Sequence, residues 1–270
     1  MQVRVGCEFV QSAPAPVHTI VQVEPRRDGA PVVVSSLWDD TTWSSSHTYF
    51  DGFGNMCRRL TFPMGTTVMR FDAVVEVDGS IDAVNESARE LPAAALPPEA
   101  LVFAMPSRYC PSDQLANVAG NLFGQLPPGW ARVQGICDWV HANIQFGYML
   151  TGPMKTATDV FVSRQGVCRD FAHLAISFCR ALNIPARYAF GYLPDIGVPA
   201  NHDVMDFVAW MEVYLEDRWW TFDPRNNARR VGRVLIGRGR DSLDVAMITS
   251  FGALQLDAMT VWADEVVSPG

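Results

Sequence analysis

The first 80 residues alternate between apolar and polar positions with the period of two that is typical of β-strands. Apolar runs near 21–23, 32–37, 57–62 and 67–77 extend this pattern, and the glycine-containing segment 51–55 predicts a turn between two strands. The first predicted strand has an apolar face made of Val3, Val5, Cys7 and Phe9. Because no helical period occurs, we predict an antiparallel β-sandwich-like domain over residues 1–90.

Helical spacing begins after an Ala- and Pro-rich stretch at residues 91–98, which we interpret as a domain connection. Helices are predicted over 112–123, 130–144, 157–162 and 168–182. Strands are predicted at 186–193, 208–215 and 219–222, and a last strand pair within 254–266. Helices followed by strands predict an α+β core domain over residues 91–270.

Composition and charge indicate a globular protein and argue against two kinds of partner. Of the 270 residues, 49% are hydrophobic and 19% charged. The net charge of −8 and the lack of a basic run make nucleic acid and membrane surfaces unexpected partners. No segment approaches the ~18 apolar residues that span a bilayer. The first residues lack the apolar core of a signal peptide, so we expect a cytoplasmic protein.

The six cysteines show neither Cys-x-x-Cys nor zinc-site spacing, so we expect reduced thiols, no metal and no cofactor. Cys168 differs from the other five. It follows Gly166 at the start of a predicted helix with a continuous apolar face. The free N–H groups and the dipole at such a position lower a thiol pKa and can hold an oxyanion. The sequence therefore predicts a nucleophile here, and a buried structural cysteine remains the alternative.

A predicted hairpin supplies partners for this thiol. If residues 216 and 217 form a two-residue turn, Trp210 lies opposite Asp223. Val208 is then the diagonal neighbour of Asp223 on the same face, at about 7–8 Å. A histidine at position 208 would be oriented by Asp223 and would present its second nitrogen to the thiol. This is the geometry of a Cys–His–Asp triad.

These segments resemble the transglutaminase-like superfamily, in particular its bacterial two-domain members. The resemblance rests on Gly-Val-Cys168-Arg-Asp-Phe-Ala-His-Leu, Asn183-Ile-Pro-Ala-Arg-Tyr, Asp206-Phe-x-Ala-Trp210 and Thr221-Phe-Asp223. It implies a papain-like α+β core in which a Cys nucleophile, a His base and an Asp orienter act on peptide or glutamine-type amides. By position, Cys168 corresponds to the nucleophile and Asp223 to the orienter. Val208 occupies the position of the histidine.

A valine cannot accept a proton, and losing a general base typically costs about 10²–10⁴ in rate. The resemblance therefore implies a cysteine hydrolase or acyl-transferase site that is weakened or silent. The alternative is a non-catalytic member that binds a peptide or protein in the same cleft. We consider His202, six residues before Val208, as a substitute base, and expect His173 in the core. Asp206 and Trp210 are expected to line the cleft.

Overall fold

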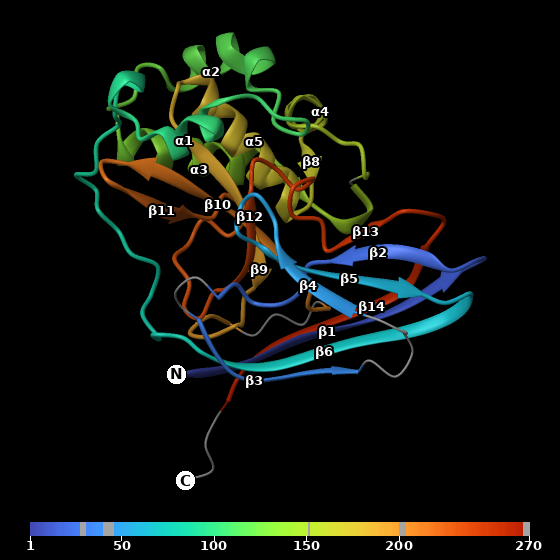
Figure 1. Cartoon of the computed structure of the whole chain (residues 1–270). Helices are drawn as coiled ribbons and strands as arrows, with labels where there is room; N and C mark the ends of the chain where they lie inside the picture. Colours follow the sequence, from blue (N-terminus) through green and yellow to red (C-terminus); the bar gives the residue numbers. More distant parts are fainter. Residues whose placement is uncertain (28–30, 40–45, 151, 200–203, 267–270) are drawn as a thin grey trace.

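The computed structural model describes residues 1–27, 31–39, 46–150, 152–199 and 204–266, and it combines a β-sandwich with an α+β part (Figure 1). The helices are α1 (Pro98–Leu101), α2 (Ala116–Phe123), α3 (Trp130–Asn143), α4 (Ala157–Ser163) and α5 (Cys168–Ala181). The strands are β1 (Gln2–Ala13), β2 (Val17–Val21), β3 (Val32–Asp39), β4 (Ser46–Phe50), β5 (Met56–Phe62), β6 (Gly65–Glu76), β7 (Gln145–Phe146), β8 (Gln165–Gly166), β9 (Ala186–Tyr192), β10 (Val208–Leu215), β11 (Arg218–Phe222), β12 (Val234–Gly239), β13 (Ile248–Ser250) and β14 (Gln255–Glu265).

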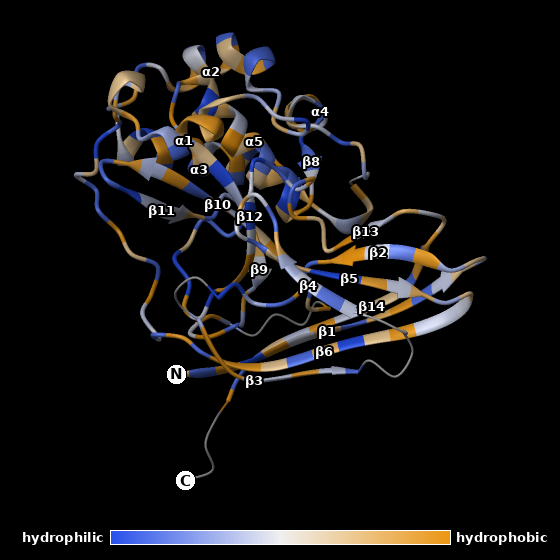
Figure 2. Cartoon of the chain, viewed as in Figure 1, coloured by the Kyte–Doolittle hydropathy of each residue, from blue (hydrophilic) through white to orange (hydrophobic). Residues whose placement is uncertain are grey.

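The sandwich consists of two antiparallel sheets, in the strand orders β14-β1-β6-β3 and β13-β2-β5-β4. Apolar and polar residues alternate along β2 and β6 (Figure 2), and the apolar faces meet in the core. Gly54 closes the turn between β4 and β5 with a positive φ of 72°. The predicted α+β class, with an antiparallel sandwich at the N-terminal end, is confirmed.

The C-terminal strands differ from the prediction in their partners. We expected a strand pair within 254–266 as part of the second domain. Instead one long strand, β14, pairs with β1, and β13 pairs with β2. Both strands complete sandwich sheets because they cover edges that β1 and β2 would otherwise expose. The proposed boundary at residue 90 stays a prediction, but the chain returns to the sandwich after residue 247.

The α+β part is built on a third antiparallel sheet in the order β11-β10-β9-β12. Helix α5 packs on β9 and β10 and is covered on its other sides by α2, α3 and α4. Every residue from Asp170 to Arg180 is buried, so this helix forms the centre of the core. Residues 77–97 connect the two parts as a long, mostly irregular trace (Figure 1).

Predicted and observed elements agree best where one face of an element is buried. Helix α5 and strand β10 begin at the predicted residues, Cys168 and Val208. The helix predicted from Ser112 instead starts with a 3-10 turn over Ser112–Leu115 and becomes α-helical at Ala116. Strand β12 was not predicted. No helix within the described ranges is both long and apolar enough to cross a bilayer.

Candidate functional site

Cys168 is the first residue of α5, and the backbone before it is tightly held. The N–H of Val167 donates to Oδ2 of Asp170 at 3.0 Å, which caps the helix from its third position. Gly166 lies so close to this carboxylate that an added Cβ would come within 2.5 Å of the Asp170 Cβ. Close packing therefore requires glycine at position 166. The first turn of α5 determines where the Cys168 thiol lies.

The thiol of Cys168 faces the start of β10. Its Sγ lies 3.8 Å from the carbonyl oxygen of Phe207, and the N–H of Ala209 also interacts with it. All six cysteines lie in the described part of the chain, and five of them are buried, whereas Cys168 is partly exposed. Cys168 thus lies at a helix start beside a strand and is partly exposed, and its role as a nucleophile stays a prediction.

The protonation state of this thiol differs from the prediction. Burial raises the pKa of Cys168 to about 11, and the nearby Asp206 carboxylate raises it further. The N–H groups of Ala209 and Arg169 and the charge of Arg225 lower this pKa without offsetting the burial. The start of α5 does lower this pKa, as predicted, but the net direction is upward because desolvation of the sulfur is the larger effect. At neutral pH the sulfur is a thiol.

Cys168 lines two neighbouring cavities. The larger, about 410 Å³, is mostly apolar and lies between Tyr109, Tyr188 and the segment 242–248. The smaller, about 80 Å³, contains Val208 and several charged side chains. Asp206 lines both cavities, with its Oδ1 accepting from the N–H of Phe207 at 2.7 Å. The Cys168 thiol thus lies between the larger, mostly apolar cavity and the smaller cavity with charged side chains.

The hairpin has the register that we predicted. Leu215 pairs with Arg218 across a two-residue turn, and the ladder continues to Met211 and Phe222. Trp210 and Asp223 are therefore the next opposed positions, and Val208 is diagonal to Asp223. Glu216 adopts a positive φ of 56°, as the first position of such a turn requires. Val208 and Cys168 line the same small cavity, and the assignment of Val208 to the position of a base stays a prediction.

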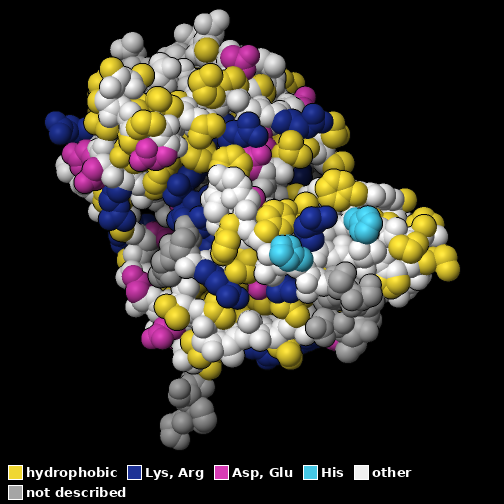
Figure 3. Space-filling model, viewed as in Figure 1, with side chains coloured by type: hydrophobic (Ala, Val, Ile, Leu, Met, Phe, Trp, Pro, Cys, Tyr) yellow, Lys and Arg dark blue, Asp and Glu magenta, His cyan; other side chains and the backbone are white. Residues whose placement is uncertain are grey.

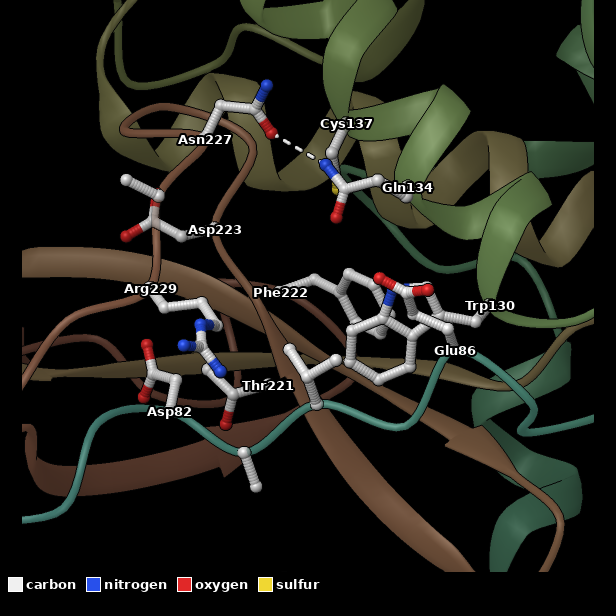
Figure 4. A pocket seen from close by; sticks show the side chains of 13 residues that line it. Asp82, Glu86, Trp130, Gln134, Cys137, Thr221, Phe222, Asp223, Asn227 and Arg229 are labelled. Atoms are coloured by element: carbon white, nitrogen blue, oxygen red, sulfur yellow. Dashed lines mark hydrogen bonds between the residues drawn. The ribbon is translucent and has the colours of Figure 1, made fainter.

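Asp223 already has two partners, Asn226 and Arg233. Its Oδ1 accepts from the backbone N–H of Asn226 at 2.9 Å, and its Oδ2 accepts from the Asn226 amide at 2.8 Å. Arg233 adds an ion pair to Oδ2 at 2.9 Å. Figure 4 shows Asp223 on the wall of a separate cavity of about 260 Å³, where Gln134 donates to Asn227. The carboxylate that would orient a histidine instead anchors the loop after β11.

Three further predictions concern residues around this arrangement. Trp210 is 2% exposed and packs against Val208 beneath the Arg233 guanidinium, so it lies behind the cavities and does not line them. His202 lies outside the described residues. His173 is buried, accepts from the N–H of Ser242 and stacks on Tyr109, as expected of a core histidine. Burial lowers its pKa well below the usual range.

Sequence reasoning missed the arginines of this site. Arg225 and Arg230 line the small cavity, and Arg233 pairs with Asp223. A signal was present, because residues 224–233 contain four arginines directly after the candidate orienter. Their roles depend on a loop conformation that no periodic pattern encodes.

Comparison with known proteins agrees with this geometry. A sequence model described as the transglutaminase-like superfamily matches residues 116–224. The crystal structure of a candidate cysteine protease from Cytophaga hutchinsonii superposes with a TM-score of 0.88 and 29% identity, covering 100% of this chain and 93% of that one. An uncharacterized protein of Mycobacterium leprae is 24% identical over 93% of this chain and 94% of its own length. One from Mycobacterium tuberculosis is 26% identical over 79% of this chain and 74% of its own.

Proposed function

Because this chain belongs to the transglutaminase-like superfamily, we propose that Cys168 is a nucleophile for peptide or glutamine-type amides and that its activity is strongly weakened. In this proposal the minor thiolate form of Cys168, its proton lost to water, attacks the amide carbonyl, and the N–H groups at the start of α5 stabilise the oxyanion. The C–N bond then breaks, the leaving amine takes up a proton from water, and a second water molecule hydrolyses the thioester to regenerate the thiol. The amide occupies the cleft formed by the two cavities. The similarity to a candidate cysteine protease supports a hydrolytic outcome.

The observation that carries this proposal is the environment of one sulfur atom. Cys168 is the partly exposed cysteine, lies at the N-terminus of a buried helix and opens into two cavities. Val208, on the wall of one of them, can neither take the thiol proton nor stabilise a thiolate. The nearby carboxyl, Asp206, has a pKa raised by burial, and as an anion it disfavours the thiolate.

A second candidate function is binding of a peptide-like ligand without turnover. It is favoured by the ion pair between Asp223 and Arg233, which gives the orienting carboxylate a structural partner. The apolar cavity of about 410 Å³ next to Cys168 offers space for a side chain of such a ligand. Both functions use the same cleft, and they differ in whether Cys168 reacts.

Replacing the sulfur separates the two functions. We expect Cys168→Ala to abolish a slow release of product from fluorogenic peptide amides and from a glutamine-containing peptide, because no other group in the proposal attacks the carbonyl. The measurement is the initial rate with the unaltered chain and with this variant. Cys110→Ala, at a fully buried cysteine away from both cavities, is the matched control. Equal rates for the unaltered chain and Cys168→Ala would contradict the catalytic proposal and favour binding alone.

A further inference from the structure

The small cavity beside Cys168 has an uneven distribution of charge. Its charged side chains are Arg225, Arg230, Asp195 and Asp206. The Nη2 of Arg230 donates to Asp195 at 2.8 Å and to the carbonyl oxygen of Pro194 at 2.9 Å, so these two charges compensate each other. Figure 3 shows Lys and Arg side chains along the junction of the helical part with the sandwich. Arg225 and Asp206 are the remaining charges of the cavity.

Arg225 has no ion pair and no side-chain hydrogen bond within the part of the chain that the structure describes. Its guanidinium lies over the ring of Phe146, with Cζ at 4.0 Å from the ring centroid. This contact uses the face of the guanidinium and leaves its N–H edge available. Asp206 lies within electrostatic range but not within 4 Å, and burial raises the pKa of its carboxyl. Among the described residues, the positive charge of Arg225 therefore lacks a direct counter-ion.

The backbone that carries Arg225 is held from both sides. Nδ1 of His141, on α3, donates to the carbonyl oxygen of Arg225 at 2.7 Å. The following residue, Asn226, makes two hydrogen bonds to the Asp223 carboxylate. The guanidinium thus projects from a fixed loop, which lowers the entropy lost when it binds a ligand.

Arg230 offers a second donor. This residue is 9% exposed, and its Nε is buried without a hydrogen-bond partner among the described residues. A buried N–H without a partner costs about 1–3 kcal/mol, and an acceptor that reached this atom from the cavity that Arg230 lines would remove that cost. An anion would gain most, because hydrogen bonds to charged groups are the stronger kind.

We propose that this cavity binds a free carboxylate next to Cys168, held by Arg225 and aided by Arg230. The ligands of the cleft are then peptide-like amides that carry a carboxylate close to the scissile bond. The volume of about 80 Å³ suits a carboxylate with one or two further carbons, given that a water molecule occupies about 30 Å³. This inference rests on the proposed role of Cys168, but its test requires no turnover.

The test compares two alkylating reagents of the same shape. Iodoacetate and iodoacetamide both react by attack of the thiolate sulfur on CH₂ with loss of iodide, and only iodoacetate carries a carboxylate. Changes in the thiol pKa affect both rates equally. The ratio of the iodoacetate rate to the iodoacetamide rate therefore reports carboxylate binding. The rates at Cys168 are read by mass spectrometry of its peptide, at about 0.15 M salt to screen distant charges.

We expect Arg225→Gln to lower this ratio by about tenfold or more, the value of one charge-assisted hydrogen bond. Arg225→Lys retains the charge and should lower the ratio less. Arg229→Gln removes the same charge from an exposed residue outside the cavity and should change the ratio by less than about twofold. In the unaltered chain, the rate with iodoacetate should saturate with concentration, whereas the rate with iodoacetamide should stay linear.

Equal effects of Arg225→Gln and Arg229→Gln on the ratio, or a linear rate with both reagents, would overturn the carboxylate site. Such a result leaves the proposed chemistry of Cys168 intact. The opposite outcome is also distinguishable. If the rate ratios are as expected but the unaltered chain and Cys168→Ala release product equally, the carboxylate site is supported and the catalytic proposal is contradicted. A peptide library in which Asp replaces Asn, or a free C-terminus replaces an amide, then identifies the source of the carboxylate.

Discussion

Val208→His is expected to raise amide hydrolysis by about 10²-fold, at the lower end of what a general base contributes. The new imidazole would project into the small cavity that Val208 shares with Cys168, and could take the thiol proton. The hairpin register sets position 208 diagonal to Asp223, as orientation of a histidine requires. The gain stays modest because Asn226 and Arg233 already occupy the oxygens of Asp223. The measurement is kcat/KM for fluorogenic peptide amides.

Two controls isolate the base from other effects of the substitution. Val208→Asn introduces a polar side chain without a basic nitrogen and should leave the rate within a few-fold of the unaltered chain. Adding Cys168→Ala to Val208→His should remove the gain, because the imidazole acts through the sulfur. Equal turnover by the Val208→His variant and the unaltered chain would show that the missing histidine does not limit this site.

Arg233→Met is expected to lower the free energy of unfolding by about 3 kcal/mol, a typical cost of removing one partner from a buried ion pair. Arg233 bridges Asp82 and Asp223, each at 2.9 Å, and its guanidinium lies over the Trp210 ring. The side chains of Arg233 and Asp223 are only 9% and 2% exposed, so water cannot replace the lost partner well. Urea denaturation at neutral pH provides the measurement.

Arg229→Met is the matched control, because it removes the same charge four residues earlier from an exposed side chain. It should change the free energy of unfolding by no more than about 0.5 kcal/mol. If Arg233→Met changed the free energy of unfolding as little as Arg229→Met, the ion pair between Arg233 and Asp223 would not stabilise the fold. Asp223 would then be free to orient a histidine in the Val208→His variant.

Sequence periodicity was sufficient to predict the regular elements that carry three of the candidate residues. The apolar face of α5 and the two-residue turn after β10 fix Cys168, Val208 and Asp223 through local spacing. Strand β12 escaped prediction because Gly237 and Gly239 interrupt its pattern. The pairing of β14 with β1 joins the two ends of the chain, and no local pattern specifies such a contact.

The electrostatics of the site could not be predicted from the same patterns. A helix start predicts a lowered thiol pKa, but burial of the Cys168 sulfur in the folded chain reverses the net direction. The roles of Arg225 and Arg233 depend on the path of an irregular loop anchored by Asn226. Such side chains gain a function from tertiary packing, so only the structure reveals their positions.

The pH dependence of Cys168 alkylation by iodoacetamide tests most directly whether this sulfur lacks a base. With a pKa of about 11, about one thiol in several thousand is ionised at pH 7.5, and the rate should keep rising about tenfold per pH unit up to pH 10. Val208→His should flatten this profile by supplying an imidazolium partner near neutral pH. A plateau below pH 8 in the unaltered chain would contradict the protonated thiol and reveal a base already coupled to Cys168.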